Sequence, residues 1–149
     1  MITKLNNPTT EQLDEILTIW LTANLDAHDF VEPEYWQENF DLVKQTLPDA
    51  ELYVATEDHQ IVAFLGLAEN YIAGLFVNKQ YRSRGLGTDL LNSVKEQQQF
   101  LQLSVYEKNS RAINFYLNNG FTPKTSDVDF KTNEVEYLMT WQKPNLDML

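Results

Sequence analysis

The sequence predicts a single α/β domain with a mixed sheet, and three observations support this prediction. The chain has 149 residues, 43% of them hydrophobic and 22% charged, which fits one globular domain over residues 1–149. Amphipathic segments alternate with short segments rich in β-branched and aromatic residues. The predicted order is strand, two helices, three strands, helix, strand, helix and two strands, which is typical of an α/β domain.

The first 50 residues predict a short strand and two amphipathic helices. The strand is Ile2–Leu5. Thr9 and Gln12 have the spacing of a capping box, which predicts that a helix begins beside them. Its apolar residues follow the i, i+3, i+4 pattern and are Leu13, Ile16, Leu17, Trp20 and Leu21. After a loop over residues 28–31, a second helix ends near Pro48, and its apolar residues are Trp36, Phe40, Val43 and Leu47. Both helices therefore bury one face.

Three strands follow. Residues 51–56 and 61–68 are rich in strand-forming residues and flank a polar turn, which predicts an antiparallel hairpin. The third strand is Tyr71–Val77, and it contains Gly74 in its interior. A glycine there indicates a bulge or the close approach of another backbone or a ligand.

The rest of the chain predicts two helices and three strands. A helix with Leu86, Leu90, Leu91 and Val94 on one face follows the polar segment 78–85. A strand over Phe100–Tyr106, a helix over Arg111–Asn119 ended by Gly120, and strands near 121–127 and 134–142 complete the chain.

Composition excludes several classes of function. The chain has no cysteine, which excludes disulfides, thiolate metal sites and a cysteine-linked intermediate. Two histidines argue against a zinc enzyme, so we expect no metal. A net charge of -11 repels phosphate backbones and anionic lipids, so we expect neither nucleic acid nor membrane partners. Without a signal peptide or an apolar run of about 20 residues, the predicted location is the cytoplasm.

The charge is unevenly distributed along the chain. Residues 1–60 carry 13 acidic side chains against Lys4 and Lys44, whereas residues 61–149 carry nine of each sign. Within the neutral part, Lys79, Arg82 and Arg84 form a small basic group.

This basic group lies where a strand runs through a loop into a helix, and the loop contains Gly85 and Gly87. Backbone N–H groups at a helix start attract anions, and glycines let a phosphate approach closely. The segment therefore predicts a pyrophosphate site. It lacks the Gly-Lys-Ser/Thr of a P-loop and the third glycine of a dinucleotide fingerprint. The alternative is a tight turn with solvated arginines.

These residues resemble a known family, the GNAT N-acetyltransferases. Residues 82–87, Arg-Ser-Arg-Gly-Leu-Gly, are similar to that family's Arg/Gln-x-x-Gly-x-Gly/Ala signature. Residues 109–121 are similar to its Asn-x-x-Ala-x-x-Phe-Tyr-x-x-x-Gly-Phe motif, and residues 27–30 resemble a small bacterial subgroup whose substrate is usually unknown. The resemblance implies a single-domain GNAT-like fold: a mixed, mostly antiparallel sheet with a central splay and about four helices.

The resemblance also implies that acetyl-CoA is the co-substrate. Its pantetheine arm would lie in the splay and pair with the backbone of Leu75, Phe76 and Val77. The residues that it implies at the pyrophosphate are Arg82, Arg84, Gly85, Leu86, Gly87 and Thr88. Asn109 would either bond the pantetheine or end the preceding strand.

The same family implies direct attack of an amine on the thioester, with Tyr116 as general acid to the departing thiolate. The alternative is a packing role, because Ile113, Tyr116 and Leu117 form one helix face. Glu69, His28 and Asp29 are candidate general bases, as is ordered water. His28 could instead be a loop or cap residue, and Glu69 an exposed strand end.

In this family the two N-terminal helices border the acceptor cleft. The acidic first half therefore predicts a cationic acceptor, such as a polyamine, an aminoglycoside-like amine or a peptide amine, unless these acids only confer solubility. The leading hypothesis is an N-acetyltransferase acting on a primary amine, as a monomer or homodimer. A CoA-binding sensor is the alternative, and a toxin acting on aminoacyl-tRNA is disfavoured by the net charge.

Overall fold

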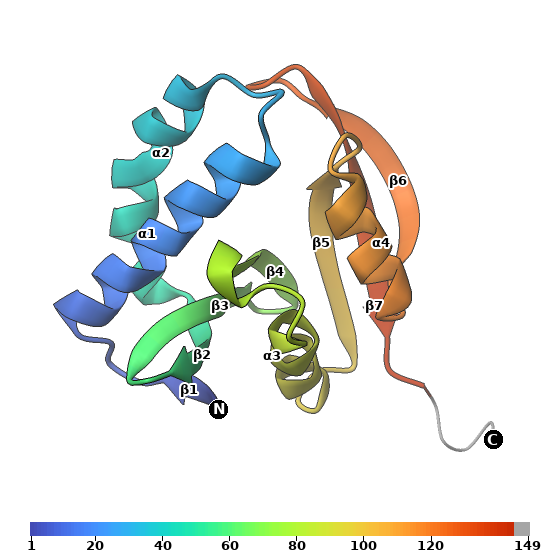
Figure 1. Cartoon of the computed structure of the whole chain (residues 1–149). Helices are drawn as coiled ribbons and strands as arrows, with labels where there is room; N and C mark the ends of the chain where they lie inside the picture. Colours follow the sequence, from blue (N-terminus) through green and yellow to red (C-terminus); the bar gives the residue numbers. More distant parts are fainter. Residues whose placement is uncertain (145–149) are drawn as a thin grey trace.

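The computed structural model describes residues 1–144, and its elements follow the predicted order (Figure 1). The helices are α1 (Thr10–Ala27), α2 (Pro33–Thr46), α3 (Leu86–Lys95) and α4 (Ser110–Asn118). The strands are β1 (Ile2–Leu5), β2 (Glu51–Glu57), β3 (Gln60–Ala68), β4 (Tyr71–Val77), β5 (Phe100–Tyr106), β6 (Thr122–Asp129) and β7 (Glu134–Gln142). Short 3-10 turns cover Leu47–Asp49 and Lys79–Tyr81.

The seven strands form one sheet in the order β1-β2-β3-β4-β5-β7-β6. Every neighbouring pair is antiparallel except β4 and β5. These two parallel strands pair only at Tyr71 and Gln102 and then separate (Figure 1). The mixed, mostly antiparallel sheet with a central splay is thereby confirmed.

A bulge in β4 lies beside the splay. Gly66 of β3 pairs with Gly74, whereas Leu67 pairs with Ile72, so Ala73 is the extra residue. The bulge is therefore next to Gly74, where the sequence predicted an irregularity. It bends β4 close to the point where the β4–β5 pairing ends.

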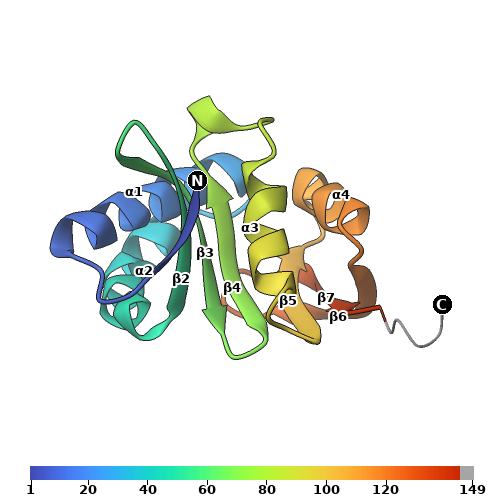
Figure 2. The same cartoon turned by 90° about the horizontal axis from the view of Figure 1, so that it is seen from below.

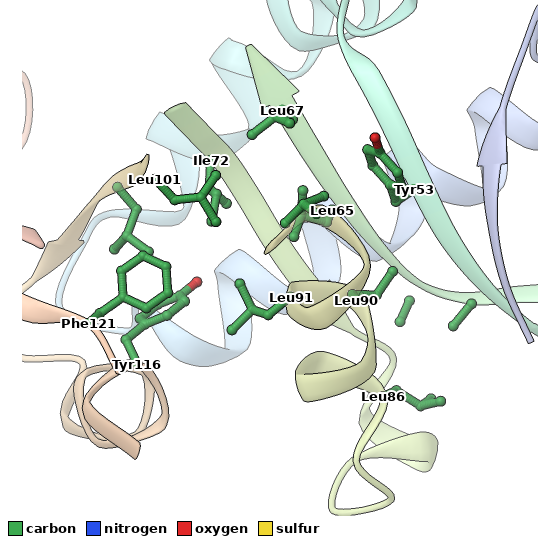
Figure 3. Close-up of a cluster of buried hydrophobic side chains, with 14 of the residues drawn as sticks. Tyr53, Leu65, Leu67, Ile72, Leu86, Leu90, Leu91, Leu101, Tyr116 and Phe121 are labelled. Atoms are coloured by element: carbon green, nitrogen blue, oxygen red, sulfur yellow. The ribbon is translucent and has the colours of Figure 1, made fainter. Parts of the chain in front are cut away.

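Helices cover both faces of the sheet (Figures 1 and 2). On one face, Ile16 and Leu17 of α1 pack against Leu52, Val54 and Phe64 of the sheet. On the other face, a larger core joins α3 and α4 to the strands (Figure 3). Its fully buried side chains include Leu65, Leu90, Leu91, Leu101 and Phe121.

Local signals placed most element ends within two residues. The capping box is confirmed, because the Gln12 N–H donates to Thr9 Oγ1 at 3.1 Å and the Thr9 N–H donates to Gln12 Oε1 at 2.9 Å. β6 begins at Thr122, one residue after the predicted start near 121. The Phe121 N–H donates to the Tyr116 carbonyl where α4 ends, and Gly120 has a φ of +89° there, so Phe121 belongs to the helix closure.

Among the described residues, none of the helices has the length and apolar character needed to cross a membrane.

Candidate active site

Two cavities meet where β4 and β5 separate. The larger, about 780 Å³, is bordered by the end of α1, the end of β4 and the starts of α3 and α4. The smaller, about 360 Å³, is bordered by α1, the start of α2, and strands β4, β5 and β7. Both are lined by Leu75, Phe76, Asn109, Ala112 and Tyr116. A molecule in one cavity can therefore contact a molecule in the other at the splay.

The start of α3 forms one wall of the larger cavity. Gly85, Leu86, Gly87 and Thr88 all line it. Gly85 precedes the helix with a φ of +80°, a conformation that other residues rarely adopt. A Cβ at Gly87 would lie 2.9 Å from Phe115 Cζ, so a side chain there would crowd this wall. Because the first N–H groups of a helix lack intrahelical acceptors, this wall presents donors to an anion.

The two predicted phosphate arginines lie in different places. Arg82 lines the larger cavity and its Nη1 lies 2.9 Å from Asp26 Oδ2. This hydrogen bond lowers the pKa of Asp26, aided by the positive charge of Lys79. The Arg84 side chain is not part of the cavity lining. It lies over the Tyr81 ring and pairs with Glu57 at 3.4 Å.

Two further cations line the larger cavity, and the sequence analysis missed both. Lys108 and Arg111 lie at the start of α4, on either side of the Asn109 cap. Their signal was present, since both fall within or beside the second family motif. Together with Arg82 they make this cavity more basic than the rest of the acidic molecule.

The last residues of β4 form a second wall. Leu75, Phe76 and Val77 line the larger cavity. Because β4 pairs with β5 only at Tyr71, the β4 edge that faces β5 has no strand partner along these residues. Its backbone N–H and C=O groups can pair with an extended molecule lying in the gap.

Tyr116 lies at the junction of the two cavities and is also part of the core (Figure 3). Its ring packs edge-on against Phe115 and Phe121, with centroids 5.3 and 5.6 Å away. Burial raises the pKa of its hydroxyl well above the usual value, so the group is a neutral donor at physiological pH. The packing and chemical interpretations are therefore compatible.

His28 lies in a chain of hydrogen bonds that joins α1 to α4. Its Nδ1 is 3.0 Å from Asn24 Oδ1, and its Nε2 is 3.1 Å from Asn109 Nδ2. The other Asn109 side-chain atom, Oδ1, accepts from the Ala112 N–H, and Asn24 Nδ2 donates to the Trp20 carbonyl. Since Asn109 must donate to Nε2, the proton of the neutral ring lies on Nδ1. Burial lowers the pKa of His28 to about 4, so the ring is neutral at pH 7.

Asn109 takes part in this series of hydrogen bonds, a role that the sequence analysis did not predict. Asn109 caps α4 and fixes His28, whereas the prediction offered a pantetheine contact or a strand end. Both nitrogens of His28 are occupied, so the geometry supports the loop or cap interpretation of this residue over a general base.

The other two candidate bases line neither cavity. Glu69 is exposed in the turn between β3 and β4, with a φ of +57°, and Asp29 is exposed in the loop between α1 and α2.

The smaller cavity has aromatic walls and one acidic side chain. Its aromatic residues are Trp20, His28, Tyr35, Trp36, Tyr71, Phe76, Tyr106 and Tyr116. The only acidic residue in its lining, taken over residues 1–144, is Glu136 of β7. The acidic residues of the first half, from which the cationic acceptor was predicted, contribute no carboxylate to this lining. The alternating pattern of the strand could not show whether the Glu136 side chain is exposed to solvent or lines a cavity.

A splayed α/β sheet whose open end holds a helix start and three cations is suited to an extended, phosphate-bearing acyl donor, which is the kind of site that an acyltransferase needs. A family model described as "Acetyltransferase (GNAT) domain" matches residues 48–123. The chain belongs to the GNAT acetyltransferase family, and it transfers the acetyl group of acetyl-CoA to an amine.

Individual relatives agree with this assignment. The chain is 32% identical to peptidyl-lysine N-acetyltransferase YiaC of Escherichia coli K12, over 87% of this chain and 90% of that protein. It is equally similar, at 32% identity, to peptidyl-lysine N-acetyltransferase YjaB of the same organism, over 87% and 89% of the two chains.

Solved structures match as well. The solution structure of apo YjaB from Escherichia coli superposes with a TM-score of 0.82 and 28% identity, covering 95% of this chain and 96% of that one. A Bacillus anthracis acetyltransferase solved with acetyl coenzyme A gives a TM-score of 0.59 and 26% identity, covering 64% of this chain and 63% of that one. None of these relatives supports the CoA-binding sensor.

Proposed function

We propose that this protein acetylates the side-chain amine of lysine in a peptide or protein, with acetyl-CoA in the larger cavity and the lysine in the smaller one. The observation that carries the proposal is the pair of cavities that share Tyr116 and the end of β4. The curated relatives, both named for peptidyl-lysine acetylation, support the choice of acceptor.

The larger cavity fits the chemistry of coenzyme A. The start of α3 supplies backbone donors for a pyrophosphate, and Arg82, Lys108 and Arg111 supply positive charge. The side chain of Arg84 lies outside this lining, so we assign Arg84 a contribution through its backbone and its charge only. The unpaired edge formed by Leu75, Phe76 and Val77 is suited to the two amides of an extended arm.

The unpaired β4 edge also suggests how the reaction is promoted. A thioester beside it can receive a hydrogen bond from a backbone N–H, and one such donor lowers a barrier of this kind by about 2.7–4 kcal/mol. Tyr116, a neutral buried donor that lines both cavities, would hydrogen bond the departing thiolate. Glu69, His28 and Asp29 are not proposed as bases, on the geometry given above.

Two cavities suit a ternary complex better than a covalent acetyl-enzyme. The chain has no cysteine to carry the acetyl group, and both molecules can be present at once on opposite sides of the splay. Direct attack then benefits from the fixed proximity of the reactants. Cytoplasmic location, the absence of a metal, and a monomeric or homodimeric state remain predictions.

A direct assay tests the acceptor. The protein is incubated with acetyl-CoA and the peptide acetyl-Gly-Ala-Lys-Ala-Gly amide, and free CoA thiol and peptide mass are followed. We expect one acetyl group on the lysine. The matched control replaces this lysine by norleucine, and spermidine serves as a different primary amine. CoA release with spermidine but not with the lysine peptide would refute the lysine assignment while preserving the acetyltransferase activity.

A further inference from the structure

Glu136 is a partly buried carboxylate that faces the smaller cavity without a counterion. It lies on β7, beside Tyr106 of β5 and Asp127 of β6 in the strand register. Among residues 1–144, no hydrogen bond or ion pair neutralises it. Its neighbour Glu134, by contrast, pairs with Lys108 at 3.0 Å. Burial disfavours the charged form of such a carboxylate, and a cation bound beside it would stabilise that form.

The groups around Glu136 add negative charge and aromatic surface. Burial and the carboxylates of Asp129 and Asp127 raise the pKa of Glu136. Asp129 is itself held by the Tyr106 hydroxyl, which donates at 2.9 Å. Burial also raises the pKa of Tyr35, helped by the charges of Asp129 and Glu136. Asp127 and Asp129 from β6 therefore act on Glu136 through their charge. The titratable side chains that line its cavity from the other elements are Tyr35, Tyr106, His28, Tyr71 and Tyr116, and no lysine or arginine of residues 1–144 lines it.

The aromatic walls are suited to a cation on an apolar stem. Trp36 is in edge contact with Tyr35 at 4.9 Å and with Trp20 at 6.0 Å between centroids. Aromatic faces attract ammonium groups, and their apolar surface accommodates the methylenes of a long side chain.

One buried donor in this wall also lacks a partner. Trp36 is 7% exposed, and its Nε1–H has no hydrogen-bond partner within the described part of the chain. Such a donor is costly to leave unmatched. A ligand that carries a carbonyl group, as a peptide does, would satisfy it.

We propose that Glu136 binds the ammonium group of the acceptor in the smaller cavity and takes its proton, which rests on the amine acceptor proposed above. The proton moves from R-NH₃⁺ to the Glu136 carboxylate, and the freed nitrogen lone pair forms the bond to the thioester carbon. The C–S bond breaks with its electron pair on sulfur, and the second nitrogen proton reaches that thiolate to give CoA-SH. Glu136 then releases its proton to water, so the products are the amide, CoA-SH and one proton.

Glu136→Gln tests this role, and Glu134→Gln is the matched control. The control removes a carboxylate two residues away on the same strand, outside the lining of the cavity. Rates are measured at pH 7.5 with the lysine peptide and with a primary amine of low basicity that is uncharged at that pH. Thermal unfolding with and without acetyl-CoA shows that each variant is folded and binds its co-substrate.

We expect Glu136→Gln to lower kcat/KM for the lysine peptide about 100-fold, within the range of general-base effects. The uncharged amine should lose no more than about threefold, because it has no proton to give up before attack. The deficit with the lysine peptide should shrink as the pH approaches about 10.4, where the lysine amine is itself deprotonated. Glu134→Gln releases Lys108 of the larger cavity from its ion pair, so it should change the rates with the two amines by the same factor.

Equal losses for the charged and uncharged amines, or wild-type rates in Glu136→Gln, would overturn the proposal. If Glu136→Gln does not fold, Glu136→Asp keeps the charge but shortens the side chain. Glu136→Asp should then lower kcat/KM only for the charged acceptor. Wild-type values of kcat/KM with both amines would overturn the proposal. If the wild type acetylates spermidine and not the lysine peptide, the lysine assignment is wrong. Spermidine then replaces the lysine peptide as the charged acceptor when the wild type and Glu136→Gln are compared. Acetylation of no primary amine would overturn both.

Discussion

His28 should make the stability of this protein depend on pH between about 6.5 and 4. The pKa of a histidine in an unfolded chain is about 6.5, whereas burial lowers that of His28 to about 4 in the folded protein. The unfolded state therefore binds the proton first as the pH falls. Stability from this group is intact above pH 6.5, declines as the pH falls and is fully lost below about 4.

The magnitude follows from the separation of the two pKa values. Each pH unit between them is worth about 1.4 kcal/mol, so the full loss is about 3 kcal/mol. The structural cause is burial of the ring, which disfavours the charged form and outweighs the opposing effect of the nearby Asp29 carboxylate. The hydrogen bond from Asn109 Nδ2 to His28 Nε2 at 3.1 Å also suits the neutral ring, because a protonated Nε2 would direct its own hydrogen at this donor.

The assay is the free energy of unfolding, measured by denaturant titration at several pH values for the wild type and for His28→Gln. The difference between the two curves isolates His28 from the carboxylates that titrate in the same range. We expect it to change by about 3 kcal/mol between pH 7 and 4. The ¹H NMR titration of the ring gives the pKa directly, and since the chain has two histidines, His59→Gln assigns the signals.

Asn109→Asp should reverse the behaviour of His28. Aspartate caps a helix as well as asparagine does, so α4 should keep its cap. Its second carboxylate oxygen would accept a hydrogen bond from a protonated Nε2, and such a neighbour raises the pKa of a histidine by about 1–3 pH units. A pKa of His28 near 6.5 in the wild type, or a pKa unchanged in Asn109→Asp, would refute the hydrogen-bond assignment.

Three further substitutions test separate parts of the site. Tyr116→Phe should lower kcat about 100-fold, measured by CoA release, with little change in the acetyl-CoA dissociation constant; unchanged turnover would assign the residue to packing alone. Gly85→Ala should lower the free energy of unfolding by about 1–2 kcal/mol because φ is +80° there with no atom within 4 Å of the new Cβ, and Gly85→Asn should cost less. Lys95→Met should lower the free energy of unfolding by about 1–2 kcal/mol, because it leaves the Asn119 carbonyl at the end of α4 without its donor, and it should not affect acetyl-CoA binding. The control is Lys124→Met, at an exposed position. Equal melting temperatures of the two variants would contradict the role of Lys95 in closing the helix.

The order of elements could be predicted from the sequence because local patterns determine it. Helix periodicity, the Thr9–Gln12 capping box and the glycine-rich start of α3 are each encoded within a few residues. The interior Gly74 also indicated the bulge correctly. What separates β4 from β5 depends on pairing between distant strands, and only the family resemblance indicated it.

The site was harder to predict because its residues meet only through the fold. Asn109 and His28 are 81 positions apart in the chain, and no local pattern joins them. Arg82 and Arg84 are separated only by Ser83 in the motif, yet their side chains diverge toward Asp26 and Glu57. Glu136 lies in an alternating strand in which every second residue shares its face, so periodicity cannot show that it meets a cavity.

The helix α4 connects the two halves of the proposed reaction. Its N-cap Asn109 is held by His28 from α1, its first turn carries Arg111 beside the larger cavity, and its buried Tyr116 lies at the junction of both cavities. Because both ring nitrogens of His28 are bonded, neutral His28 fixes the distance between α1 and the start of α4. Protonation would break the Asn109 contact and release this end of α4, so the position of Tyr116 depends on a residue that we exclude from proton transfer. Loss of activity in a His28 variant would then appear in kcat without the change in pH profile that removal of a general base produces.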